Sequence, residues 1–174
     1  MIGTVLSNIL RVLLLLALQI LVLDHLDVAN GWMIPYLYVL ALLLLPFELP
    51  AWALLMIGGL LGGAMDLFNN TAGMHTTACL VMMYVRSFWQ RLLAPREGYE
   101  FGMRPDTQHM GFSWFLTYAG VLVLVHHLWL FLFELHRFDR FFSTFLRALT
   151  SGVFTLVLCL LVQLLARRSG RERA

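Results

Sequence analysis

Residues 58–75 read GGLLGGAMDLFNNTAGMH, an apolar, glycine-rich segment that ends in a carboxylate and a polar turn. Glycine destabilises a helix interior unless a neighbour must approach the backbone closely. A carboxylate at the edge of a membrane span is costly unless it is paired or hydrated. Because both costs fall within a few residues of each other, we expect specific structure in this stretch.

The glycines and the carboxylate are expected to share one helix face. Gly58 and Gly62, and Gly59 and Gly63, form two overlapping pairs at the four-residue spacing that lets helices pack closely in membranes. Asp66 follows Gly62 by four residues and therefore lies on the same face. We expect this face to pack against a helix of the same chain, with Asp66 capping the next turn. A partner helix or a small ligand at Asp66 is the alternative.

The polar residues after Asp66 are typical of a turn between two helices. Gly73 and His75 open the second of these helices, and Cys79 lies one helical turn beyond His75. A metal site needs three or four ligands, and no CxxC or HxxxH pattern supports one here. We therefore expect no metal and no cofactor.

The composition is that of an integral membrane protein. Of the 174 residues, 60% are hydrophobic and 13% charged, about half the usual charged share of a soluble domain. The mean hydropathy is +0.80. The net charge of +2 is too small to indicate nucleic-acid binding. Cys79 and Cys159 both fall in apolar runs, so no disulfide framework is indicated.

Six apolar runs predict an all-α fold with a single polytopic domain of six transmembrane helices. They cover roughly residues 4–23, 32–46, 50–68, 74–89, 112–133 and 141–166. A span needs about 20 residues to cross a hydrocarbon core of about 30 Å. The run 32–46 is shorter, and we interpret it as a short span, with a re-entrant hairpin as the alternative.

The arginines predict the orientation in the membrane. Six spans place both termini on one side, and short cytoplasmic loops are rich in basic residues. The loop 90–111, its borders and the tail 167–174 would then be cytoplasmic. Their arginines are expected to set the topology, or to contact anionic lipids or an acidic partner. They are Arg86, Arg91, Arg96, Arg104, Arg167, Arg168, Arg171 and Arg173.

Catalysis is not indicated. The serines of the apolar runs do not occur in a Gly-x-Ser-x-Gly setting, and Asp66 has no second intramembrane aspartate to form an acidic pair. The chain contains no P-loop and no dinucleotide fingerprint. His126 and His127 are adjacent and point in different directions on a helix. A proton relay through them is conceivable, but we interpret them as interior histidines whose hydrogen bonds are satisfied.

Residues 59–68 (GLLGGAMDLF) and 73–76 (GMHT) resemble the signature region of the MreD family, the bacterial rod shape-determining membrane proteins. The doubled glycine pair and the long loop 91–111 depart from the family pattern. The resemblance implies a non-enzymatic scaffold of the cell-elongation complex in the bacterial cytoplasmic membrane. Its partners would be an MreC-like protein, and also MreB, RodA and a class B transpeptidase. Together these direct lateral peptidoglycan synthesis and hence cell shape.

The MreD family is itself similar in architecture to the substrate-binding membrane components of energy-coupling-factor transporters. This similarity implies a bundle like that of those components. It also implies an alternative function, capture of a vitamin or metal ion for a transporter. A hydrated pocket near the outer face would then be lined by Asp66, Asn69, His75 and Trp32.

Overall fold

The structure is a computed structural model that describes residues 2–26, 28–134 and 141–171. In these ranges it contains helices and no strand. The elements are α1 (Ile2–Leu21), the 3-10 helix η1 (Leu23–His25), α2 (Val39–Leu43), α3 (Ala51–Asn69), α4 (Met74–Leu92), α5 (Phe112–Phe133) and α6 (Phe141–Arg171). Four helical stretches are long and apolar enough to cross a membrane: Leu6–His25, Ala51–Asn69, Phe112–Phe133 and Phe141–Ala166.

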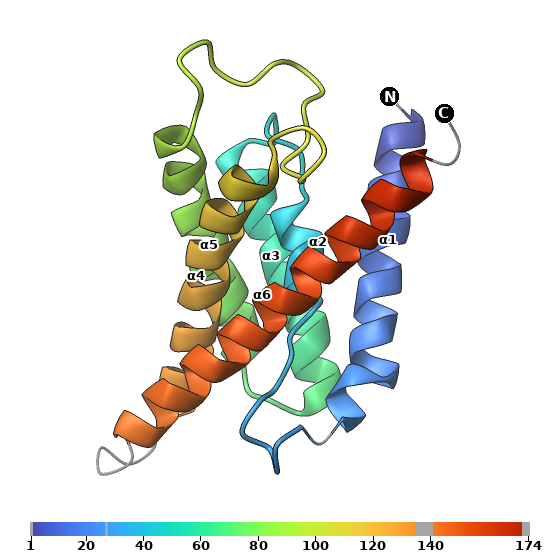
Figure 1. The fold of residues 1–174 in the computed structure, drawn as a ribbon. Helices are drawn as coiled ribbons and strands as arrows, with labels where there is room; N and C mark the ends of the chain where they lie inside the picture. Colours follow the sequence, from blue (N-terminus) through green and yellow to red (C-terminus); the bar gives the residue numbers. More distant parts are fainter. Residues whose placement is uncertain (1, 27, 135–140, 172–174) are drawn as a thin grey trace.

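The long helices run side by side along a bundle, and α6 crosses the others obliquely (Figure 1). The pairs α3–α4, α4–α5 and α5–α6 pack against each other, so helices that follow one another in the sequence are also neighbours in space. The start of α1 and the end of α6 lie at the same end of the bundle as the loop 93–111 (Figure 1). The turn between α3 and α4 lies at the opposite end.

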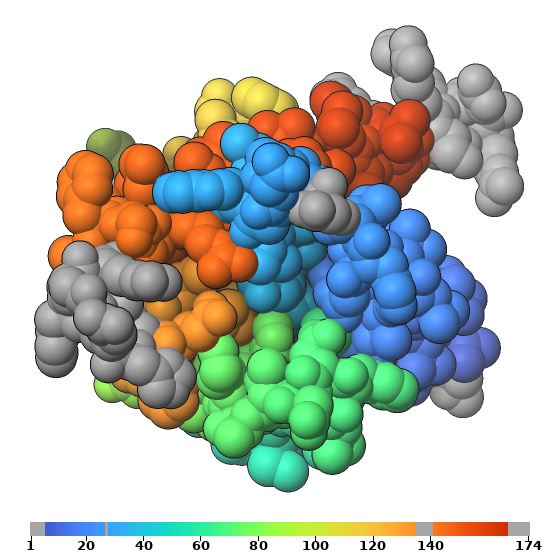
Figure 2. Space-filling model, turned by 90° about the horizontal axis from the view of Figure 1, so that it is seen from below, coloured from blue at the N-terminus to red at the C-terminus, as the bar shows by residue number. Residues whose placement is uncertain are grey.

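The prediction of a helical span over residues 32–46 is wrong. Only Val39–Leu43 form a helix, and the chain before it runs from one end of the bundle into its centre (Figure 1). Seen from that end, this light-blue segment lies between α1, the α3–α4 turn and the start of α6 (Figure 2). Fifteen residues in a helix would cover only about 22 Å, less than the roughly 30 Å of a hydrocarbon core. Pro35 also favours extended backbone in the residue before it.

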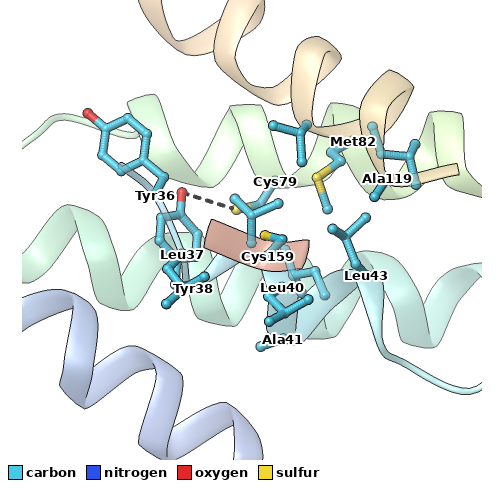
Figure 3. Packing of buried hydrophobic residues seen from close by; sticks show 14 of the residues in the cluster. Tyr36, Leu37, Tyr38, Leu40, Ala41, Leu43, Cys79, Met82, Ala119 and Cys159 are labelled. Atoms are coloured by element: carbon cyan, nitrogen blue, oxygen red, sulfur yellow. Dashed lines mark hydrogen bonds between the residues drawn. The ribbon is translucent and has the colours of Figure 1, made fainter. Parts of the chain in front are cut away.

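This interior segment, residues 33–46, is the centre of the hydrophobic core. Tyr38, Val39, Leu40, Leu42 and Leu43 are fully buried. Side chains of α4, α5 and α6 surround the segment (Figure 3). Among those drawn are Cys79, Met82, Ala119 and Cys159. Both cysteines are buried free thiols, as the sequence predicts.

Backbone groups of the extended part of this segment are bonded by polar side chains from two helices. Gln19 of α1 donates to the Pro35 carbonyl oxygen at 2.8 Å. Ser151 of α6 accepts from the Ile34 N–H at 3.1 Å, and Thr155 accepts from the Tyr36 N–H at 3.0 Å. Unpaired backbone groups are costly away from water, so these isolated polar residues in apolar helices stabilise the non-helical crossing. The donor, Gln19, lies on α1, and the two acceptors, Ser151 and Thr155, lie on α6.

The ends of α4 and α6 differ from the predicted spans. Helix α4 continues to Leu92 and α6 to Arg171, so the predicted loop 90–111 begins after residue 92 and much of the predicted tail is helical. Among the arginines expected in the tail, Arg167, Arg168 and Arg171 have side chains outside the described part of the structure. Arg173 lies entirely outside the described residues.

The loop 93–111 packs against the end of the bundle. The rings of Tyr99 and Phe47 stack with centroids 3.9 Å apart, and the Tyr99 hydroxyl donates to the Gln90 carbonyl oxygen. Burial raises the pKa of Tyr99 to about 12. Glu48 accepts from the Gly102 N–H at 2.6 Å. These contacts give the loop a defined position although it contains no helix.

Replacing Thr155 by valine keeps the shape of the side chain but removes the acceptor for the Tyr36 N–H. We expect Thr155→Val to lower the unfolding free energy by about 1–3 kcal/mol, because a buried backbone donor is left unpaired. Thermal unfolding of the purified protein in detergent measures this as a lower Tm. The control is Thr117→Val, whose hydroxyl is exposed on α5 and bonds only within its own helix. Equal Tm values for the two variants would contradict the role assigned to Thr155.

Candidate functional site

Asp66, near the end of α3, caps the start of α4. The residue at the N-cap of α4 is Gly73, which has a φ of 80° and no side chain to accept a hydrogen bond. Asp66 supplies the missing acceptor. Its Oδ1 accepts from the His75 N–H at 3.0 Å and its Oδ2 from the Thr76 N–H at 2.9 Å. These are the second and third residues of the helix, the donors that an N-cap side chain normally satisfies.

Two hydroxyl groups complete the environment of this carboxylate. Thr71 donates to Oδ1 and Thr76 to Oδ2, each at 2.6 Å. Both oxygens of Asp66 therefore have two donors from the chain itself, and the residue is 9% exposed. The positive end of the α4 dipole adds to the stabilisation of the negative charge. The polar atoms that could have bound a ligand are thus occupied by the α3–α4 connection.

Gly62 and Gly58 lie on the face of α3 that packs against α4. A Cβ atom at Gly62 would lie 2.6 Å from the carbonyl oxygen of His75 and equally close to the Cα of Thr76. A Cβ atom at Gly58 would lie 2.8 Å from the side chain of Met83. At Gly62 the obstacle is backbone, which cannot move aside as a flexible side chain can. Close approach of the two backbones therefore requires glycine at position 62.

The second glycine pair is less constrained. A Cβ atom at Gly59 would meet Leu80 at 3.5 Å, and one at Gly63 would meet the Thr76 hydroxyl at 3.7 Å. Both distances are ordinary van der Waals contacts. The two overlapping pairs therefore differ: Gly58 and Gly62 form the intrachain contact with α4, whereas Gly59 and Gly63 border it.

His75 connects this seam to the centre of the bundle. The hydroxyl of Tyr38 lies 3.0 Å from His75 Nδ1 and 2.8 Å from His126 Nε2, so one hydroxyl links α4, α5 and the interior segment. The Cys79 sulfur lies 3.8 Å from the same oxygen. Sequence reasoning did not pair these residues, because Tyr38 belongs to the segment that it interpreted as a helix.

The hydroxyl of Tyr38 can donate only one hydrogen bond, so one of the two imidazoles must donate to it. Nδ1 of His126 is buried and has no hydrogen-bond partner among the described residues. A buried N–H without a partner is rarer than a buried acceptor without one. We therefore assign the proton of His126 to Nε2, which donates to Tyr38, and the hydroxyl of Tyr38 donates to His75.

His127 has hydrogen-bond partners different from those of His126, although the two rings lie with their centroids 5.3 Å apart. Its Nδ1 lies 2.8 Å from the Val123 carbonyl oxygen and its Nε2 lies 3.0 Å from the Thr155 hydroxyl. The described residues contain no group of three or more His, Cys, Asp or Glu side chains arranged to hold a metal ion. Hydrogen bonds of the Tyr38 hydroxyl join the interior segment to α4 and α5 in this cluster.

Arg86 is not the loop or headgroup residue that its sequence position indicated. It is fully buried; its Nε donates to the Tyr118 hydroxyl at 2.6 Å and its Nη2 to the Leu45 carbonyl oxygen at 2.5 Å. Tyr118 in turn donates to the Leu43 carbonyl oxygen at 3.0 Å. Together Arg86 and Tyr118 satisfy carbonyls at the end of α2. A signal for this was present, because Arg86 shares the helical spacing of His75 and Cys79.

The other described arginines of this region lie nearer the surface. Arg91 is exposed in the last turn of α4 and donates to the Ser87 carbonyl oxygen at 2.8 Å. Arg96 is exposed in the loop and Arg104 is partly buried there. These three positions are compatible with the expected contacts to lipid headgroups.

Within its described residues the structure is an all-helical bundle. The stretches 59–68 and 73–76, which carry the sequence resemblance, join neighbouring helices in it. Comparison with known proteins found no matching family model, no matching curated protein and no matching solved structure.

Adding a methyl group at Gly62 should separate α3 from α4. We expect Gly62→Ala to lower the unfolding free energy by about 1–3 kcal/mol, because overpacking against backbone cannot relax through a rotamer change. The matched control is Gly63→Ala, where the new Cβ finds ordinary contacts. Thermal unfolding should give a lower Tm for Gly62→Ala only; a loss of the same size in both variants would refute the assigned difference.

Replacing the Asp66 carboxylate by an amide should destabilise the start of α4. In Asp66→Asn, one acceptor oxygen becomes an NH₂ group that faces backbone N–H donors, so we expect a loss of about 1–3 kcal/mol. Thr76→Val removes one donor to the same carboxylate and should have a smaller effect. Its control is Thr77→Val, whose hydroxyl donates only to the Met74 carbonyl oxygen. An unchanged Tm for Asp66→Asn would contradict the capping role.

Proposed function

We propose that this chain is a non-enzymatic membrane scaffold of the bacterial cell-elongation complex, with a role like that of the MreD family. It would lie in the cytoplasmic membrane with both termini cytoplasmic. It would associate with an MreC-like protein, and also with MreB, RodA and a class B transpeptidase. In this way it would help regulate lateral peptidoglycan synthesis and cell shape.

This proposal is supported by the structural role of the residues that carry the sequence resemblance. Gly62, Asp66, Gly73 and His75 hold α3 against α4, and the polar atoms of Asp66 are consumed by hydrogen bonds within the chain. Such an arrangement stabilises a surface to which partners can bind, and it leaves few polar atoms available for a chemical reaction. The two ends of the bundle also fit the proposed topology, because the helix termini and the arginine-bearing loop 93–111 lie at the same end (Figure 1).

The surface beside the α3–α4 seam is the proposed place for a partner helix. Gly59 and Gly63 border the seam with room for a Cβ atom, and Leu60 is 70% exposed between them. Small residues allow a second helix to approach closely in lipid, where the hydrophobic effect does not hold helices together. Because Gly58 and Gly62 already contact α4, the partner contact falls on the other glycine pair.

The alternative, capture of a vitamin or metal ion, has less support. It requires a hydrated pocket lined by Asp66, Asn69, His75 and Trp32. A hollow of about 350 Å³ does border Trp32, but its other lining residues belong to the segment 30–31 and to the start of α6. Asp66 and His75 instead make hydrogen bonds within the chain. A tight hit in a thermal-shift screen against vitamins and metal ions would nevertheless favour this alternative.

Co-purification of the full-length chain with an MreC-like protein, expressed together in a bacterial membrane, tests the scaffold proposal. We expect Gly59→Leu to lower partner recovery several-fold while the Tm of the isolated protein stays close to wild type. Gly120→Leu is the matched control, because a Cβ atom there also finds only ordinary contact, with Leu156 at 3.8 Å. Equal partner recovery from both variants, or no recovery by the wild-type chain, would overturn the proposal.

A further inference from the structure

A cleft of about 470 Å³ lies where α1, α6 and the loop 93–111 meet. Its apolar wall comes from α1, from α2 and the residue after it, and from α6, and consists of Leu10, Leu14, Leu15, Leu40, Leu44, Val162 and Ala166. Its polar rim includes Arg11 on α1 together with Arg104 and Asp106 on the loop. One cleft therefore joins a long apolar wall to a charged rim.

The rim has an excess of positive charge. Arg11 lies in the middle of an apolar helix, and its Nη1 donates to Asn8 at 3.2 Å. Within the described residues no carboxylate forms an ion pair with it. Arg104 and Asp106 of the loop line the same cleft as Arg11. The charged lining of the cleft therefore consists of two arginines and one aspartate.

Asp106 is also engaged by its own loop. Its Oδ1 accepts from the backbone N–H groups of Gln108 and His109, each at 2.9 Å, and lies 2.8 Å from Nδ1 of His109. Because Oδ1 of Asp106 already accepts these hydrogen bonds, the carboxylate is less available to pair with Arg11 or Arg104. An arginine inside a span is costly unless it reaches a headgroup or an anion, so Arg11 lacks a full counter-charge from the chain.

Helix α1 leaves part of the apolar wall of this cleft exposed at the surface of the bundle. Its packing is mainly with η1 and α2, and Figure 1 shows it as the outer, blue helix of the bundle. Leu10 and Leu14 line the cleft and are 55% and 60% exposed. An acyl chain can therefore enter from the side, along the same wall that leads to the two arginines.

We propose that this cleft is a binding site for a net-negative glycerophospholipid. The phosphate oxygens accept hydrogen bonds from Arg11 and Arg104, since the planar guanidinium fork matches phosphate geometry. One acyl chain lies along the leucine wall. The single net positive charge of the rim matches one phosphodiester, whereas a zwitterionic headgroup would bring a further cation towards the guanidinium groups. This inference stands independently of the proposed scaffold function.

The headgroup part of the site can be tested by native mass spectrometry of the full-length chain in detergent. The protein is incubated with equal amounts of phosphatidylglycerol and phosphatidylcholine that have the same acyl chains. We expect at least a threefold preference for retained phosphatidylglycerol, and we expect Arg11→Gln or Arg104→Gln to reduce the ratio towards one. The control is Arg96→Gln, an exposed arginine of the same loop that does not line the cleft, so it removes the same charge and accounts for any general attraction of exposed arginines to anionic lipid. No preference in the wild type, or an unchanged ratio in both cleft variants, would overturn the proposal.

The acyl part of the site is tested by filling the cleft. Ala166 is exposed and lines the cleft, so Ala166→Trp occupies it without disturbing the core. Leu165→Trp, at an exposed neighbouring position outside the lining, is the control. We expect only Ala166→Trp to lose retained phosphatidylglycerol. Loss in neither variant, or equal loss in both, would count against the proposed path of the chain.

Two further measurements are needed. The first distinguishes a lipid site from a site for a free anion, and the second distinguishes loss of lipid binding from loss of folding. Inorganic phosphate at millimolar concentration should not displace phosphatidylglycerol; displacement would indicate an anion site without a lipid tail and would overturn the proposal. The rise in Tm on adding phosphatidylglycerol is measured within each variant, because a ligand stabilises only a state that binds it. We expect this rise in wild type and Arg96→Gln, and its absence in Arg11→Gln and Arg104→Gln; an equal rise in all four would refute the site.

Discussion

The rest of the structure depends on the need of a non-helical segment to have its backbone groups bonded inside an apolar bundle. Residues 33–46 pass through the centre of the molecule, yet only Val39–Leu43 form a helix. Gln19 and Thr155 form hydrogen bonds with backbone groups of the part before α2. Arg86 donates a hydrogen bond to a backbone carbonyl after α2. Without these side chains the segment would leave polar backbone in a setting that offers no water.

The same physical requirement explains the α3–α4 connection. A helix start has N–H groups without intrahelical partners, and Gly73 cannot supply a side-chain acceptor. Asp66 provides it from the preceding helix, while Gly62 removes the side chain that would hold the two backbones apart. The carboxylate and the glycine therefore act together. This is why the most unusual stretch of the sequence has an architectural role.

Close packing in the centre contrasts with the loose attachment of α1. Helices α3 to α6 contact one another in sequence order, whereas α1 rests mainly on the interior segment and on η1. Its flanks form clefts, one apolar and beside α3, the other charged and beside α6. Arg11 faces the second cleft. The bundle thus combines a core in which side chains from several helices bond the backbone of the interior segment with a periphery suited to lipids and partner helices.

Local spacing determined much of this protein from the sequence alone. The spacing of Gly58, Gly62 and Asp66 predicted one packed face, because positions four apart on a helix always lie together. The apolar runs predicted the long helices by their length, because about 20 apolar residues are needed to cross a hydrocarbon core. The run 32–46 has no helical periodicity from which its structure could be predicted, since an apolar stretch without periodicity fits a buried helix or a buried extended segment equally well. Only the tertiary structure decided that most of it is not helical. Only the tertiary structure could pair Tyr38 with His126 and Arg86 with Tyr118, because those contacts depend on how distant segments pack and not on spacing within one helix.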